Sequence, residues 1–306
     1  MKIVSLLPSA TEIVYALGLG NSLAARTHEC DYPAEVLRKP VITRSILPDG
    51  LSSSEIDAAV REQLGGSHSL YTIDRDLLAT TQPDVILTQQ LCAVCAVSYD
   101  DVLDAVRALP APGPCLVNLE PTTLEAVWET ITRVGAATGR EHEAAQVTAS
   151  LRARVDAVRE RAALAKTRPR TVLLEWLDPL FCGGHWDPEL VEIAGGFDAL
   201  GRMHAPSTQI SWDCVREFAP EVLVVAQCGF GIERTAQDMT QFQLLPGYGE
   251  IPAVQNRRVY LVNGSDYFSR PGPRLADSLE ILASLIHPEL FDEMQPDLER
   301  VMPWNP

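Results

Sequence analysis

A long helical stretch divides this chain into two halves that repeat the same local pattern. In each half, short apolar strands alternate with helical segments, which is typical of a parallel α/β sheet covered by helices. The stretch between the halves, residues 122–166, is rich in Ala, Glu, Arg, Val and Leu with a helical period that breaks near Gly139. Apolar heptads do not persist along it, so it predicts a structural spine rather than a coiled coil.

A short sequence pattern that occurs once in each half supports a protein with two similar lobes. Residues 82–87 (Gln-Pro-Asp-Val-Ile-Leu) and 219–224 (Ala-Pro-Glu-Val-Leu-Val) each read as a helix end, a proline turn, an acid and a buried strand. We therefore expect two Rossmann-like α/β lobes joined by a long backbone α-helix. The expected boundaries are 1–120 for the N-terminal lobe, 121–168 for the bridging helices, and 169–306 for the C-terminal lobe with its proline-rich tail.

Local signals place the elements within this scheme. Ser9 is predicted as an N-cap, with Glu12 three residues on completing a capping box. The expected strands are 3–7, 23–27, 85–88, 115–119, 171–176, 222–225 and 258–262. The further expected helices are 73–80, 98–109, 188–193, 212–218 and 271–286.

Composition excludes several classes of protein. With 25 Lys and Arg against 41 Asp and Glu, the net charge of −16 disfavours nucleic acid and anionic membranes as partners. The longest apolar run is far short of the roughly 20 residues that span a bilayer. Seven cysteines, spread along the chain, do not form a disulfide framework. The start at Met1 shows no secretory leader, so the expected location is cytoplasmic as written, and periplasmic or extracellular if a leader has been removed.

Five segments carry a resemblance to a known family. They are Ile-Val-Ser-Leu-Leu-Pro-Ser-Ala-Thr-Glu at 3–12, His-Glu-Cys-Asp-Tyr-Pro at 28–33, Pro-Asp-Val-Ile-Leu at 83–87, Pro-Ala-Val at 252–254 before the strand at 259–262, and Phe-Ser-Arg-Pro-Gly-Pro-Arg at 268–274. Together they resemble the class III periplasmic solute-binding proteins, the helical-backbone receptors of cobalamin and ferric-siderophore importers, and are most similar to the cobalamin-binding branch. The resemblance runs over nearly the whole chain, from residue 3 to about 290.

The resemblance implies a binding protein without enzymatic activity. Its small-molecule ligand would be a corrinoid such as cobalamin, a tetrapyrrole or a metal chelate, held in a cleft between the lobes by loops at the carboxyl ends of strands. Family members dock onto an ABC permease through one acid near the tip of each lobe. The matching segments here, 92–96 and 268–270, contain no acid, which argues against docking, so an ABC permease is kept only as a possible partner.

Two segments of the C-terminal half supply candidate ligand contacts. In the segment 181–187, Gly184 permits close backbone approach, His185 offers an imidazole, and Trp186 together with Trp176 offers flat apolar surface for a macrocycle. A tight turn with a core tryptophan is the alternative reading. In the later loop, Tyr267 and Phe268 are expected to stack on the ligand and Arg270 to pair with a carboxylate or propionamide, with a purely structural loop as the alternative.

The N-terminal half supplies a second set of candidate contacts. His28 and Cys30 follow the second expected strand, where the imidazole would ligate a corrinoid cobalt or simply hydrogen-bond the loop. Gln89 and Gln90 follow the strand at 85–88 and are expected to make polar contacts, and Ser9 of the first resembling segment is a further candidate.

The pair Cys92-x-x-Cys95 opens a different reading of the function. Two thiolates at this spacing chelate a soft metal such as zinc or iron, with Cys30 or His28 as further ligands, or they form a redox pair. Buried thiols at a helix start are the plainer alternative. The rival function is therefore an intracellular metal- or thiol-dependent enzyme or a metallochaperone. The sequence contains no phosphate-binding loop, nucleophile elbow or HExxH helix.

Overall fold

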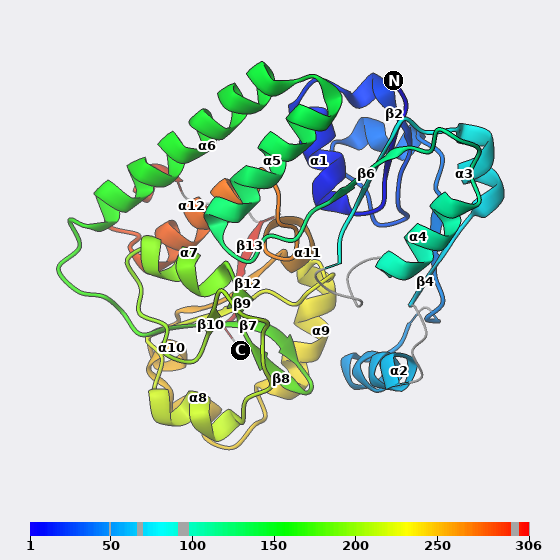
Figure 1. Ribbon diagram of the computed structural model, residues 1–306. Coiled ribbons are helices and arrows are strands. Elements are labelled where there is room, and N and C mark those ends of the chain that lie inside the picture. The colour runs from blue at the N-terminus through cyan, green and yellow to red at the C-terminus, as the bar shows by residue number, and fades with distance from the viewer. Residues whose placement is uncertain (49, 66–69, 91–97, 295–299, 306) are drawn as a thin grey trace. The chain divides into compact units, whose positions relative to one another are not determined.

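The computed structural model describes residues 1–48, 50–65, 70–90, 98–294 and 300–305, which form two compact units (Figure 1). The N-terminal unit comprises Met1–Pro121 and Glu125–Ser150, and the C-terminal unit comprises Thr122–Leu124 and Leu151–Pro306. Helix α6 (Glu141–Ala162) contributes to both units, because the boundary falls between Ser150 and Leu151. The expected α/β class is confirmed.

The N-terminal unit is built on a parallel sheet of four strands. Their spatial order is β2 (Leu23–Ala25), β1 (Ile3–Ser5), β5 (Val85–Thr88) and β6 (Cys115–Asn118). Parallel strands need helical crossovers, and both faces of such a sheet are therefore covered. This explains why the central strands β1 and β5 are buried at every position.

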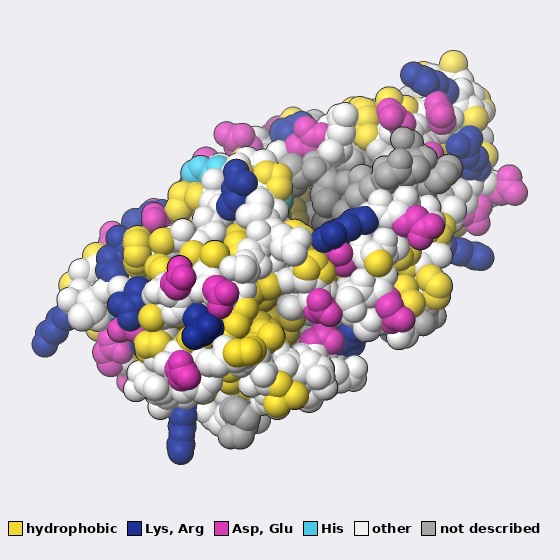
Figure 2. All heavy atoms as spheres, turned by 90° about the horizontal axis from the view of Figure 1, so that it is seen from below, with side chains coloured by type: hydrophobic (Ala, Val, Ile, Leu, Met, Phe, Trp, Pro, Cys, Tyr) yellow, Lys and Arg dark blue, Asp and Glu magenta, His cyan; other side chains and the backbone are white. Residues whose placement is uncertain are grey.

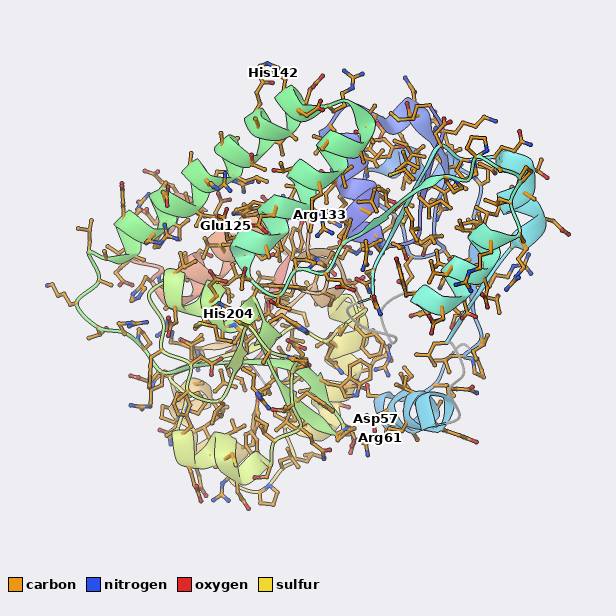
Figure 3. All side chains as sticks on the ribbon, viewed as in Figure 1. Asp57, Arg61, Glu125, Arg133, His142 and His204 are labelled. Carbon is orange, nitrogen blue, oxygen red and sulfur yellow. The ribbon has the colours of Figure 1, made fainter. Side chains whose placement is uncertain are left out.

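Helices and short segments complete the N-terminal unit. The helices are α1 (Pro8–Ala16), α2 (Ser53–Gly65), α3 (Arg75–Thr81), α4 (Tyr99–Arg107) and α5 (Leu124–Thr138), which begins in the other unit, with 3-10 turns at Gly20–Ser22 and Ala34–Arg38. Strands β3 (Thr43–Ser45) and β4 (Tyr71–Ile73) form a separate antiparallel pair. Two side-chain contacts fix the geometry locally. Arg133 of α5 donates to the carbonyl of Asn118 in β6, and Asp57 and Arg61 form an ion pair one turn apart on α2 (Figure 3).

The C-terminal unit is built on a mixed sheet of five strands. Their order is β13 (Val301–Pro303), β12 (Val259–Val262), β11 (Val222–Val225), β7 (Thr171–Leu177) and β8 (Leu180–Cys182). The three central strands are parallel, and both edge strands are antiparallel to their neighbours. The expected proline-rich tail is corrected here, because 301–303 form an edge strand; Pro303 is tolerated at an edge, where one side of the ladder is unpaired.

Six helices accompany this sheet in the described part of the unit. They are α7 (Asp187–Ile193), α8 (Trp212–Phe218), α9 (Ile232–Phe242), α10 (Pro252–Gln255), α11 (Gly264–Tyr267) and α12 (Leu275–Ile286), with 3-10 turns at Tyr248–Glu250 and Asp292–Met294. A further parallel pair, β9 (Gly184–His185) and β10 (Arg202–Met203), lies beside α7. Glu189 of α7 accepts a hydrogen bond from the backbone N–H of Leu124 at 2.9 Å and lies 3.5 Å from the exposed imidazole of His204 (Figure 3).

Several of the expected helix starts are shifted, among them the start expected at residue 271, which lies at Leu275. Two of the shifts have a local cause. Helix α1 begins at Pro8, with Leu7 as its N-cap and no side-chain capping bond, so the capping box predicted at Ser9 is wrong. Proline has no N–H to leave unpaired and its φ suits the first helical position, which is why the N-cap lies two residues earlier than predicted. The helix expected at 73–80 begins at Arg75, because Asp74 caps it by accepting from the N–H of Leu77 at 2.8 Å.

Charged side chains are scattered over the surface. On the face shown in Figure 2, lysines and arginines lie singly among the acids and do not merge into one basic field. This distribution agrees with a chain of net charge −16. Within the described part of the chain, no helix combines the length and the apolar character that crossing a membrane requires.

Arg154 joins α6 to α12 within the C-terminal unit. Its guanidinium donates from Nε to Glu280 Oε1 at 2.8 Å and from Nη2 to Glu280 Oε2 at 2.7 Å, and it also pairs with Asp277. Hydrogen bonds to Glu280 and to Asp277 raise the pKa of Arg154 above its ordinary value, so the guanidinium stays charged. This two-point contact fixes how α6 lies on α12.

We expect Arg154→Ala to lower the free energy of unfolding by about 1–2 kcal/mol, because a charge-assisted hydrogen bond contributes about 1.5–3 kcal/mol and partial exposure weakens it. The control is Arg159→Ala on the same helix, whose ion pair with Asp156 is exposed on both sides. Urea unfolding measures both variants. Equal losses would show that α6 does not depend on the Arg154 contact.

Candidate functional site

An aromatic cluster lies at the carboxyl ends of β7 and β11 in the C-terminal unit. The rings of Trp176 and Phe230 are 5.0 Å apart between centroids, and the guanidinium of Arg234 lies 4.5 Å from the centre of the Phe230 ring. Arg234 is held there by Asp238 at 2.5 Å, and Asp238 also accepts from Gln227 Nε2 at 2.9 Å. Proteins with open parallel α/β sheets bind ligands at the carboxyl ends of the strands. In this protein, that edge of the sheet presents the partly exposed rings of Trp176 and Phe230.

The segment 183–187 lies beside β7 and not beyond its end. Strand β8 runs antiparallel to β7 and brings the segment back, so that the N–H of Gly183 donates to the carbonyl of Leu173 at 2.9 Å. The half-buried imidazole of His185 stacks on Trp186 with 5.4 Å between ring centroids. Trp186 is only 6% exposed, and its Nε1 donates to the carbonyl of Phe268 at 3.0 Å. The indole therefore joins this segment to the loop that follows β12.

Two acids lie beneath the same segment. Glu175 of β7 accepts a hydrogen bond from the N–H of Gly184 at 2.6 Å and is also hydrogen-bonded to Asp187 and Ser207. Asp187, the first residue of α7, is 2% exposed. Burial, and next the negative charge of Glu175, hold the pKa of Asp187 well above its usual range. Burial also raises the pKa of Glu175, against the opposing effect of its three hydrogen bonds.

The loop after β12 is more buried than its sequence indicated. Phe268 is 2% exposed, so its ring is a core side chain and the expectation that it stacks on a ligand is corrected. Arg270 is also buried, and its Nη2 donates to Ser265 Oγ at 3.3 Å. Tyr267 is half-buried, with the guanidinium groups of Arg274 and Arg300 at 5.4 and 5.5 Å from its ring centre.

In the N-terminal unit, a buried arginine shapes the loop after β2. Arg26 Nη1 donates to the carbonyls of Thr27 at 3.0 Å and Cys30 at 2.9 Å. The imidazole of His28 lies on this loop, with Nδ1 at 2.8 Å from Thr43 Oγ1 and its ring 5.5 Å from that of Tyr71. Burial, and next the charge of Arg26, lower the pKa of His28, so the ring is neutral at pH 7. A neutral imidazole is the form that ligates metals.

The remaining candidates of the N-terminal unit differ in exposure. The thiol of Cys30 is buried and 3.0 Å from Thr11 Oγ1, which in turn donates to Ser5 Oγ at 2.8 Å. Such a thiol is a structural group and not an accessible metal ligand. Ser9 and Gln89 are buried, whereas Gln90 is exposed.

The described residues hold no cluster of three or more His, Cys, Asp or Glu side chains arranged to bind a metal ion. The predicted pair Cys92 and Cys95 lies outside the described residues.

Two α/β units, each with parallel strands at its centre and both sharing one long helix, define the class III solute-binding protein fold. Solved structures share it. A possible iron-binding periplasmic solute-binding protein from Staphylococcus epidermidis matches with a TM-score of 0.71 at 20% identity, covering 94% of this chain and 98% of its own. The periplasmic vitamin B12-binding protein of Vibrio cholerae matches with a TM-score of 0.67 at 21% identity, covering 93% and 96%.

The family named "Periplasmic binding protein" matches residues 3–265, and the chain belongs to it. Among its relatives, YvrC of Bacillus subtilis, an ABC-transporter substrate-binding lipoprotein, is 26% identical over 95% of this chain and 82% of its own length. The vitamin B12-binding protein of Vibrio cholerae is 25% identical over 91% of this chain and 86% of its own length.

Membership of this family decides between the two functions that the sequence left open. Its members are substrate-binding proteins, so the protein has a ligand-binding role, and an enzyme or metallochaperone built on Cys92 and Cys95 is not supported. The expected cytoplasmic location is not supported either, because the relatives are periplasmic proteins or lipoproteins. The resemblance noted from the sequence is confirmed.

Several residues of the site were not among the candidates taken from the sequence. Phe230, Arg234 and the acid pair Glu175 and Asp187 lie at or near the carboxyl ends of β7 and β11. A signal was present for Glu175, since an acid directly after the apolar run 172–174 of a buried strand needs hydrogen-bond partners. Phe230 had a weaker signal, an aromatic between two glycines after a strand.

Proposed function

We propose that the protein binds a flat, metal-centred macrocycle, a corrinoid of the cobalamin type first among them, and that it serves an ABC importer outside the cytoplasm. The proposal rests on the partly exposed rings of Trp176 and Phe230 at the carboxyl edge of the C-terminal sheet. Flat apolar faces suit a planar ring, and the flanking Arg234 offers hydrogen bonds to amide or carboxylate groups on its rim.

Taken by itself, the N-terminal unit holds an imidazole suited to ligating a metal. His28 is neutral at pH 7, and Thr43 engages its Nδ1, so the ring is oriented by one nitrogen while the other serves as a ligand in the usual manner of metal-binding histidines. The names of the relatives, which bind vitamin B12 or belong to ABC transporters, support the same ligand class and partner. Heme and ferric chelates are the other outcomes of the test.

The test is a titration of the purified protein with cyanocobalamin, cobinamide and hemin, followed by calorimetry and by absorbance. We expect one of the corrinoids to bind with a Kd of about 1 µM or tighter. Trp176→Ala should weaken that binding about tenfold, because an aromatic contact contributes about 0.5–1.5 kcal/mol. The matched control is Trp212→Ala, whose half-buried indole lies in α8, before the amino end of β11. No binding of any of the three at about 100 µM would overturn the proposal.

A further inference from the structure

The half-buried Glu175 and the buried Asp187 connect three segments of the C-terminal unit. Glu175 belongs to β7, and Asp187 is the first residue of α7. Their hydrogen-bond partners Gly184 and Ser207 belong to two other segments of the same unit. The backbone segments at Gly184 and Ser207 are so close that a Cβ added to Gly184 would lie 2.2 Å from the backbone nitrogen of Ser207. The two acids therefore lie where the segment carrying His185 and Trp186 is held in place.

The contact between the two side chains requires a proton. Two carboxyl groups hydrogen-bond each other only when one of them is protonated, and two buried carboxylates in contact repel strongly. Besides burial, the groups that raise the pKa of Asp187 are Glu175 first and then Cys228 and Asp198, and Glu192 in turn raises the pKa of Asp198. The adjacent imidazole of His185 supplies no charge near pH 7, because burial lowers its pKa.

The hydrogen bonds show which of the two acids is neutral. Glu175 accepts from Gly184 and is hydrogen-bonded to Ser207 and Asp187, which suits a carboxylate. Asp187 Oδ1 is buried and has no hydrogen-bond partner among the described residues. An orphan oxygen costs far less in a neutral acid than in a carboxylate. Burial raises the pKa of both groups, and that of Asp187 more strongly.

We propose that Asp187 stays protonated at neutral pH, that it donates this proton to the Glu175 carboxylate, and that the resulting pair positions the His185–Trp186 segment for ligand binding. Both are positioning residues, because they act through the backbone of Gly184 and the side chain of Ser207. Loss of the proton places two carboxylates in one buried contact. The segment between Gly183 and Asp187 then has to move to admit water.

The sign of the pH dependence follows from the proton count. A group whose pKa is raised by folding holds its proton in the native state while the unfolded chain has released it. The folding equilibrium constant therefore falls as pH rises from the unfolded pKa of an aspartate, about 3.9, to the native pKa, by up to tenfold per pH unit. Its contribution to stability is complete at acidic pH and is lost in alkali.

The experiment uses the protein without ligand and follows urea unfolding from pH 5 to 9. In Asp187→Asn, an amide donates to Glu175 and cannot ionise. We expect the folding constant of the natural protein, divided by that of Asp187→Asn, to fall by at least tenfold across this range. The lowered pKa values of His28 and His185 make the folding constant rise with pH, which is opposite to the effect of Asp187. Both histidines are present in both proteins, so the ratio of the two folding constants cancels their contributions. Asp213→Asn, at an exposed acid of α8, is the control and should leave the profile unchanged.

Parallel profiles for the natural protein and Asp187→Asn would overturn the proposal. If Asp187→Asn does not fold, the carboxyl carbon of Asp187 in the natural protein gives the same answer by NMR: a protonated shift at pH 7 supports the shared proton, and complete titration below pH 5 overturns it.

A second measurement tests the positioning role, which rests on the proposed function. Binding of cobinamide or cyanocobalamin should weaken at least tenfold between pH 6 and 9 in the natural protein and stay level in Asp187→Asn. Equal pH dependence in the two proteins would overturn the positioning role. If neither corrinoid binds at any pH, the proposed ligand is wrong, whereas the unfolding profile still decides whether the proton is shared.

Discussion

Replacing Gly184 with alanine should destabilise the C-terminal unit by about 3 kcal/mol and weaken ligand binding more than tenfold. The added Cβ would lie 2.2 Å from the nitrogen and 2.7 Å from the Cα of Ser207. These are backbone atoms, so no rotamer change relieves the clash, and β9 has to separate from the segment at Ser207 that follows β10. The hydrogen bond from Gly184 to Glu175 would lengthen at the same time.

The matched control is Gly249→Ala in the same unit. No atom lies within 4 Å of the position of its added Cβ, and its backbone conformation is open to any residue. We expect a change of less than about 0.5 kcal/mol. Urea unfolding and corrinoid titration measure both variants. If Gly184→Ala unfolds like Gly249→Ala, the contact between 184 and 207 does not hold this segment.

The elements that sequence reasoning placed well are those whose signals are local. Strand β11 coincides with the apolar run 222–225, and α8 occupies 212–218 as expected, with Ser211 as its N-cap. Proline turns before the strands at 85 and 222 marked their starts in the same way. Strand β13 escaped detection because three residues including a proline read as tail, and only pairing with β12 makes them a strand.

The site was harder to predict because it depends on chain reversals. Glu175 and Asp187 are brought together by the return strand β8, which carries 183–187 back beside β7. Burial likewise depends on tertiary packing: Phe268 and Arg270 looked like ligand contacts but lie inside the unit. The aromatic pair of Trp176 and Phe230 joins residues that are far apart in the sequence.

Trp186→Ala should lower the free energy of unfolding by about 3–5 kcal/mol, because it removes a nearly buried indole and leaves the carbonyl of Phe268 without its donor. Trp186→Phe keeps most of the ring and loses only the N–H, so the expected loss is about 1–2 kcal/mol. Since the indole joins the segment with His185 to the loop after β12, both variants should also weaken corrinoid binding.

The comparison that separates packing from binding is Trp212→Phe. In the natural protein, Trp212 Nε1 donates to the carbonyl of Pro246 at 2.8 Å, so this variant loses the same kind of hydrogen bond in the same unit. Trp212 lies in α8, before the amino end of β11. We expect Trp212→Phe to lose similar stability and to keep its affinity, and Trp186→Phe to lose both. Unchanged affinity in Trp186→Phe would mean that the indole of Trp186 only packs the core. The ligand contacts would then have to come from Trp176 and Phe230, whose partly exposed rings lie at the carboxyl ends of β7 and β11.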